Sequence, residues 1–190
     1  MGGIAGLALW MTLAARTPQT PATQTPYWGM HIAGGRSLLI LGTSDARNNF
    51  QVGLQYVKPE KHLRIGRHRG EWFQDLYYEH SGSKAGTGYF GAFPSQYDAV
   101  GYLFGARYTW GIGRYQLYGD FGLGLSYDTQ RTEDLPSRLN STPFLDFGVI
   151  IPNGAHPLSI GLRLLHVSNA GLVAHNAGQN QLFLDFGVRF

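Results

Sequence analysis

The stretch that decides the fold is Tyr115-Gln-Leu-Tyr-Gly-Asp-Phe-Gly-Leu-Gly-Leu-Ser-Tyr-Asp128. Its odd positions hold aliphatic or aromatic residues and one glycine, and its even positions are mostly polar or glycine. Side chains along a β-strand alternate between two faces, so the stretch predicts a strand with one apolar and one polar face. A strand that separates lipid from a narrow polar lumen has this pattern.

Similar alternation on both sides of this stretch predicts an all-β fold, an eight-stranded antiparallel transmembrane β-barrel. The expected strands lie near residues 29–41, 49–58, 71–81, 97–110, 113–128, 142–152, 156–168 and 180–190. After the third strand, long and short connections alternate, as the external loops and periplasmic turns of outer-membrane barrels do. The connection 59–70 is an exception, because it is long where a short turn is expected.

Composition supports a membrane barrel. The chain has 27 Gly, 11 Tyr and 11 Phe, and 14% of its residues are charged, against about 25% in typical soluble domains. A lipocalin-like soluble barrel would turn its apolar face inward, but Asp, Arg, Gln and Gly sharing one face suit a narrow lumen. The absence of Cys excludes disulfides, no His and carboxylate spacing suggests a metal or other cofactor, and a formal charge of +3 is too small to indicate nucleic acid.

The N-terminal region predicts export to the outer membrane. Residues 1–15 are expected to be a signal peptide, 16–27 a disordered spacer rich in Thr, Pro and Gln, and 28–190 the barrel. The apolar run is too short to cross a bilayer as a helix. No Lys or Arg precedes Arg16, so a hydrophobic N-terminal strand or a misplaced start codon are the alternatives.

Two polar residues continue an apolar stripe near the external end of the predicted strand 156–168. His166 and Ser168 share the parity of Leu158, Ile160, Leu162 and Leu164. Polar groups on a lipid face are costly unless they lie near the interface or have a function. Residues i and i+2 of a strand are about 6.5–7 Å apart, so a bent strand end can bring a serine nucleophile to a histidine base. The alternatives are an interfacial histidine and an ordinary Ser-Asn-Ala-Gly turn.

Asn180 has the same outward parity on the last predicted strand. We expect a register that sets Ser168 opposite Asn180 and His166 opposite Leu182. The same register sets Arg163 opposite Asp185 in the lumen, where they would form a charge pair.

The segment His166-Val-Ser-Asn-Ala-Gly-Leu172, followed by Asn176-Ala-Gly-Gln-Asn180 and a terminal strand, resembles the lipid A 3-O-deacylase (PagL-type) family. The resemblance is specific over roughly the last 30 residues. It implies a serine esterase at the external leaflet, acting through an acyl-enzyme on the 3-O-linked acyl chain of lipid A in lipopolysaccharide. It also implies Ser168 as nucleophile, His166 as base, and Asn176 with backbone N–H groups near Gly171 as oxyanion donors.

The chain departs from the family pattern at Asn180, where a Glu is expected to orient the histidine. An Asn carbonyl can hold the tautomer but does not stabilise an imidazolium as a carboxylate does. We therefore expect slow turnover or no activity, and Asp185, on the lumen face, should not substitute. A non-catalytic barrel like OmpA or OmpW and an acyltransferase barrel are the rival functions, and the sequence leaves open whether the barrel forms a homodimer.

Overall fold

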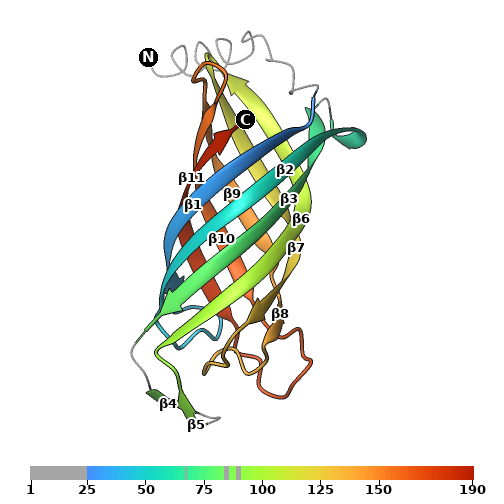
Figure 1. Ribbon diagram of the computed structural model, residues 1–190. Coiled ribbons are helices and arrows are strands. Elements are labelled where there is room, and N and C mark those ends of the chain that lie inside the picture. Colours follow the sequence, from blue (N-terminus) through green and yellow to red (C-terminus); the bar gives the residue numbers. More distant parts are fainter. Residues whose placement is uncertain (1–24, 67, 84–85, 89–90) are drawn as a thin grey trace, which may run out of the picture.

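The computed structural model describes residues 25–66, 68–83, 86–88 and 91–190. Eight strands close into an antiparallel barrel (Figure 1), which confirms the predicted fold. The strands are β1 (Tyr27–Leu38), β2 (Asn48–Ile65), β3 (His68–Gly82), β6 (Gln96–Ile112), β7 (Tyr115–Asp128), β9 (Phe144–Ile151), β10 (Leu158–Val167) and β11 (Gln179–Arg189). The expected signal peptide and residues 16–24 of the expected spacer lie outside the described residues, and Tyr27 already belongs to β1.

The barrel closes because each strand pairs with its sequence neighbour and β1 pairs with β11. β1 starts and β11 ends at the same end of the barrel (Figure 1), as an even strand number requires. The opposite end carries the long connections, which hold the short strands β4 (Gly86–Gly88), β5 (Gly91–Phe93) and β8 (Leu139–Ser141). The predicted alternation of short turns and long loops is therefore confirmed.

The connection expected at 59–70 is instead a continuation of β2 and β3. Pairing runs on to Ile65 and His68, with a bulge between Glu60 and Arg64. A β-carbon on Gly70 would lie 2.7 Å from Leu63 and 3.1 Å from Tyr108, so these two side chains meet over the glycine. Tyr108 has the same strand parity as the exposed Phe104 and Trp110 but is buried, since the bulged hairpin covers this part of the outer wall.

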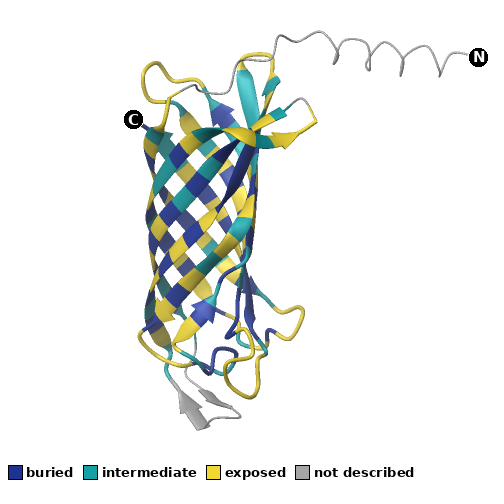
Figure 2. Ribbon diagram, turned by 90° about the vertical axis from the view of Figure 1, so that its right-hand side faces the viewer, coloured by how far each residue is buried: buried dark blue, intermediate teal, exposed yellow. Residues whose placement is uncertain are grey.

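The two faces of the barrel wall differ as the alternation predicts. Exposed and buried positions alternate along each strand (Figure 2). The exposed outer face carries large apolar side chains, among them Met30, Ile32, Leu76, Phe104, Leu123, Leu125, Phe147, Leu162, Leu184 and Phe186. This arrangement contradicts the lipocalin-like alternative. Within the described residues, no helix is long and apolar enough to span a membrane.

A buried network of charges crosses the middle of the lumen. His31 contacts Asp185 through Nδ1 at 2.7 Å and Asp75 through Nε2 at 3.0 Å. Arg163 forms ion pairs with Asp75 at 3.0 Å and Asp146 at 3.2 Å, and lies 3.7 Å from Asp185. Buried charges are tolerated when each has a partner of opposite sign. The network therefore joins five strands, β1, β3, β9, β10 and β11, from inside.

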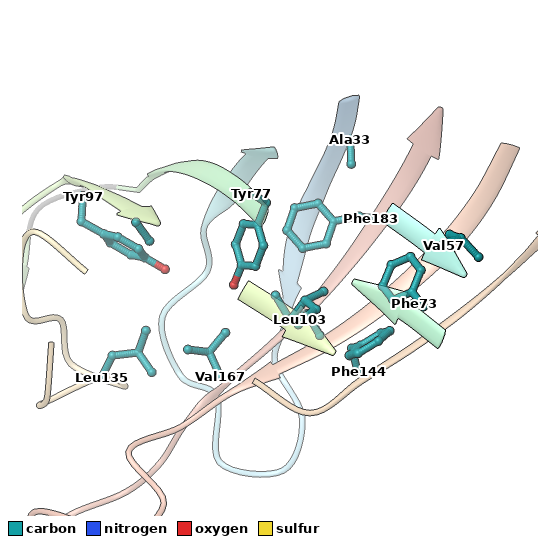
Figure 3. Packing of buried hydrophobic residues seen from close by; sticks show 12 residues of the cluster. Ala33, Val57, Phe73, Tyr77, Tyr97, Leu103, Leu135, Phe144, Val167 and Phe183 are labelled. Carbon is teal, nitrogen blue, oxygen red and sulfur yellow. The ribbon is translucent and has the colours of Figure 1, made fainter. Parts of the chain in front are cut away.

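Apolar side chains fill the lumen beside this network (Figure 3). Phe73 and Phe144 pack with their ring centroids 5.6 Å apart. Leu135, from the connection between β7 and β9, joins the same cluster as Val167 and Tyr97. The lumen is therefore a packed core, and the external connection that carries Leu135 packs against it.

Candidate active site

His166 and Asn180 form the centre of the site, side by side at the external ends of β10 and β11. They are direct cross-strand partners, and His166 Nδ1 lies 2.9 Å from Asn180 Oδ1. Neighbouring positions of the same parity, such as Leu164 and Leu182, are exposed on the outer wall. The structure thus brings together two of the residues that the sequence singled out.

The register expected for these two strands is wrong by two residues. His166 pairs with Asn180 rather than with Leu182. Arg163 pairs with Phe183 on one side and with Asp146 on the other. A slip of two residues leaves every side chain on its original face, so alternation cannot detect it.

The orientation of the Asn180 amide follows from its other contacts. Asn180 Nδ2 donates to the Ile40 carbonyl at 2.8 Å and to Thr43 Oγ1 at 3.0 Å. The Oδ1 atom therefore faces His166 as an acceptor, which requires the proton on Nδ1 of the imidazole. In this tautomer the lone pair is on Nε2, where a general base needs it.

Ser168 lies just beyond β10, in a backbone bridge to Ser141. Ser168 N donates to Ser141 O at 3.0 Å, and Ser141 N donates to Ser168 O at 2.7 Å. The two hydroxyl oxygens are 3.3 Å apart, and Ser168 is 7% exposed. In the described part of the chain no hydrogen bond joins Ser168 directly to the His166 ring, so its hydroxyl must rotate from Ser141 toward His166 to react.

The loop after Ser168 folds around the buried side chain of Asn169. Asn169 N donates to Asn176 Oδ1 at 3.0 Å, and Gly171 N donates to Asn169 Oδ1 at 2.8 Å. Asn176 therefore uses its carbonyl within the loop and keeps its Nδ2 as a donor. The Gly171 N–H, the other expected oxyanion donor, is occupied by Asn169 in this conformation.

Gly178 is a part of the site that the sequence reasoning missed. Its φ of +74° lies in the left-handed region, and a β-carbon there would be 2.9 Å from His166 Cε1 and 3.3 Å from Nε2. Glycine is required both by the backbone and by the ring beside it. The signal was present, because Gly178 lies inside the quoted Asn176–Asn180 motif.

Asp134 ties three external loops together and was also missed. Its carboxylate accepts bonds from Ser44 N, at 3.1 and 3.0 Å, from Ser44 Oγ at 2.6 Å and from Asp45 N at 2.8 Å. Its carbonyl accepts Gly178 N at 3.1 Å. The pKa of the neighbouring Asp45 carboxyl is raised, because the effect of burial exceeds the opposite effect of Arg47. These contacts join residues far apart in sequence, so no local sequence pattern predicts them.

The polar partner of the His166 ring is the amide of Asn180 rather than a carboxylate. Asp185 points into the lumen and binds His31, so it does not support His166, as expected. Across the described ranges, no group of three or more His, Asp and Glu side chains is arranged to hold a metal ion. The chemistry available to the site is that of a hydroxyl, an imidazole and side-chain amides.

An apolar depression of about 450 Å³ lies in the outer wall next to the site. Its lining includes Phe121, Leu145, Phe147, Leu162, Leu164 and Leu182. Leu164 and Leu182 each lie two residues from a site residue on the same strand, His166 and Asn180 respectively. The depression therefore extends the outward face on which the site lies.

The comparisons with known proteins agree with this picture. The crystal structure of the outer membrane enzyme PagL matches with a TM-score of 0.66 and 19% identity, over 84% of this chain and 97% of that one. The crystal structure of Neisserial surface protein A matches with a TM-score of 0.55 and 16% identity, over 86% of this chain and 95% of that one. At such identities the likeness shows the barrel fold alone.

The family is shown by sequence. No curated protein sequence matches the chain. The model of the lipid A 3-O-deacylase (PagL) family matches residues 48–189, which is most of the chain and includes the whole His166–Asn180 segment. The protein is therefore an outer-membrane β-barrel that belongs to the lipid A 3-O-deacylase family.

Proposed function

We propose that the protein is a serine esterase that removes the 3-O-linked acyl chain of lipid A in the outer leaflet. The observation that carries the proposal is the His166–Asn180 pair on the outer wall, with Nε2 of the histidine available two residues from Ser168. Ser168 is the nucleophile, His166 the general base, and Asn180 the residue that orients the imidazole.

The first half of the reaction forms an acyl-enzyme. The Ser168 hydroxyl turns from Ser141 to His166 and gives its proton to Nε2 as Oγ attacks the ester carbonyl carbon. The negative charge that develops on the carbonyl oxygen is stabilised by Asn176 Nδ2. The Gly171 N–H is a second donor once it leaves Asn169 Oδ1. The bond to the sugar oxygen then breaks, and that oxygen takes the proton from His166.

The second half releases the fatty acid. A water molecule gives a proton to His166 Nε2 and attacks the acyl carbon. The bond to Ser168 Oγ breaks, and the proton returns from His166 to Ser168. The products are a free fatty acid and lipid A with a free 3-hydroxyl group.

Asn180 supports this cycle less strongly than a carboxylate. It holds the imidazole in the required tautomer, which is the part of the role that geometry fixes. As a neutral amide it adds no opposite charge beside the imidazolium that forms during each half-reaction. We therefore propose an active enzyme that is slower than one with Glu at the corresponding position and an environment built for it.

The outer wall offers a place for the acyl chain. The apolar depression reaches Leu164 and Leu182, each two residues from a proposed site residue, and most of its lining is hydrophobic. A substrate whose ester lies at Ser168 can lay its chain on this surface, where apolar contact replaces contact with lipid. This orientation suits a substrate that never leaves the membrane.

The test is mass spectrometry of lipid A from outer membranes that contain the wild type, Ser168→Ala or Ser159→Ala. Ser159 lies at the other end of β10 and serves as the matched serine control. Loss of one 3-O-linked acyl chain with the wild type and with Ser159→Ala, but not with Ser168→Ala, supports the proposal. Unchanged lipid A in all three, with the proteins folded and inserted, favours a non-catalytic barrel, and transfer of the chain to another lipid favours an acyltransferase.

A further inference from the structure

The first external loop, residues 39–47, reaches across β1 to hold Asn180. Thr43 Oγ1 accepts the Asn180 backbone N–H at 2.9 Å and the Asn180 Nδ2 at 3.0 Å. The Ile40 carbonyl accepts the same Nδ2 at 2.8 Å. Thr43 and Asn180 are 6% and 4% exposed, so these contacts are shielded from competing water.

The polarity of this contact is fixed from outside Asn180. Thr43 Oγ1 donates its own proton to the Gly178 carbonyl at 3.1 Å. Thr43 Oγ1 therefore acts only as an acceptor toward Asn180, and the Ile40 carbonyl oxygen can also only accept. The side chain at position 180 thus meets two acceptors on one side and the Nδ1–H donor of His166 on the other. An amide can donate from Nδ2 to the two acceptors and accept at Oδ1 from His166. An ionised carboxylate has no proton to donate to Thr43 Oγ1 and the Ile40 carbonyl.

The loop is held in place by contacts of its own. Gly42 has a φ of +97°, and a β-carbon there would lie 2.8 Å from the Ala177 carbonyl oxygen. Leu41 also has a positive φ, of +50°. On the far side, Asp134 binds Ser44 and Asp45. Thr43 and Ile40 are therefore fixed between the loop before Gly178 and the loop that carries Asp134.

We infer that Thr43 and the Ile40 carbonyl form a cradle that is specific for an amide at position 180, and that Thr43 is a positioning residue of a Ser168–His166–Asn180 triad. The inference rests on the proposed function. It means that Asn180 is not a damaged form of the family's Glu but one half of a matched pair, the other half being the first external loop. Thr43 acts through Asn180, whose amide it keeps with Oδ1 toward His166.

Two substitutions at position 180 separate this inference from a simple loss of charge. Asn180→Asp keeps the size of the side chain and replaces the donor by an acceptor that faces Ile40 O. Asn180→Glu restores the family's residue in the wrong surroundings. If a carboxylate alone were missing, either change would raise kcat, but the cradle predicts that both lower it by about tenfold or more.

Substitutions at position 43 test the other half of the pair. Thr43→Val keeps the shape and removes the hydroxyl, so Asn180 loses one of its two side-chain acceptors. We expect kcat on lipid A in vesicles to fall by about tenfold, with little change in KM, and Thr43→Ser to recover most of the loss. Thr109→Val is the matched control, because Thr109 lies on β6 near the short turn to β7, at the end of the barrel away from Thr43, and this variant should behave as the wild type.

The inference has a readout that needs no catalysis. The ¹⁵N chemical shifts of the His166 ring should show the Nδ1–H tautomer in the wild type and a mixture of tautomers in Thr43→Val. Folding of each variant is checked by the heat-dependent electrophoretic mobility of the barrel. A wild type no more active than Ser168→Ala would refute the proposed function alone, and the tautomers would still decide the inference. Asn180→Asp or Asn180→Glu at or above wild-type kcat, or an unchanged tautomer in Thr43→Val, would overturn it.

Discussion

Two of the seven histidines, His31 and His166, are held in opposite ways. His31, in the lumen, has both ring nitrogens occupied by carboxylates, those of Asp185 and Asp75, and is 2% exposed. His166, on the outer wall, has one nitrogen occupied by the neutral amide of Asn180. A histidine with two partners is a structural cross-link, and one with a nitrogen to spare can act as a base.

The difference follows from where each charge would lie. In the lumen, Arg163 forms ion pairs with both carboxylates around His31, those of Asp75 and Asp185. On the outer wall the neighbours are leucines, and an unpaired charge at a lipid boundary is costly. A neutral amide orients His166 without adding a permanent charge there. The two histidines therefore differ in their partners, which are carboxylates in the lumen and a neutral amide on the outer wall.

The largest effect on activity is expected from His166→Gln. Loss of the general base should lower kcat by about 10²- to 10⁴-fold, while the barrel remains folded because the ring lies at the outer surface. The measurement is the rate of fatty acid release from lipid A by the purified, folded protein.

His31→Gln is the matched change in the lumen. It should leave the rate of the folded protein within a few-fold of wild type, because His31 does not touch the site. Equal loss of activity in both folded variants would contradict the assignment of a catalytic role to His166 and a structural role to His31.

The lumen network is tested by Asp75→Asn, which removes the charge shared by His31 and Arg163. Breaking a buried ion pair on one side typically costs about 3–5 kcal/mol. Urea-induced unfolding from lipid vesicles should therefore begin at clearly lower denaturant, with the rate per folded molecule preserved. Wild-type resistance to urea would show that the network adds no stability.

Gly178→Ala sharpens the account of the outer site. The new methyl group would lie 2.9 Å from His166 Cε1, so the imidazole must move, and the left-handed backbone at this position disfavours any side chain. A displacement of about 1 Å in a reacting group can cost about 10²-fold in rate. Gly154→Ala is the control, because Gly154 also has a positive φ but no atom within 4 Å of its β-carbon position. Equal rates for the two variants would mean that the ring does not depend on Gly178.

The smallest effect is expected from Ser141→Ala. Ser141 Oγ lies 3.3 Å from Ser168 Oγ and donates to the Ser168 carbonyl at 3.1 Å. The contact between the two hydroxyls breaks before reaction, so the support for Ser168 comes from the bond to its carbonyl. Loss of that bond is worth about 1 kcal/mol, which corresponds to roughly a fivefold fall in kcat. A loss as large as that of His166→Gln would make Ser141 part of the proton transfer rather than a support for Ser168.

Alternation in the sequence predicted the strands, the outward position of His166 and Asn180, and the inward position of Asp185. It could not set the register of β10 and β11, because a slip of two residues preserves both faces. The expected charge pair of Arg163 with Asp185 forms, at 3.7 Å, although the two residues are not opposite each other in register. The long Arg163 side chain reaches three carboxylates, and only one of them belongs to a direct partner residue, so a charge pair does not fix the register.

The external loops were beyond the reach of sequence patterns. Thr43, Asp134 and Gly178 meet through hydrogen bonds between segments that are distant in the chain. None of them lies on a strand whose periodicity gives its direction. The proposed reacting residues could therefore be picked out in the sequence, but the loop residues that surround them could not.

The most direct test of the central claim is covalent labelling with a long-chain alkylphosphonate that carries a good leaving group. Such a reagent reacts with a serine activated by a histidine base and mimics the tetrahedral intermediate. The account predicts one adduct per wild-type chain, located on Ser168 by peptide mass spectrometry, and none in His166→Gln. An adduct on another residue, or a folded wild type that stays unlabelled, would contradict an outward-facing Ser168–His166–Asn180 site.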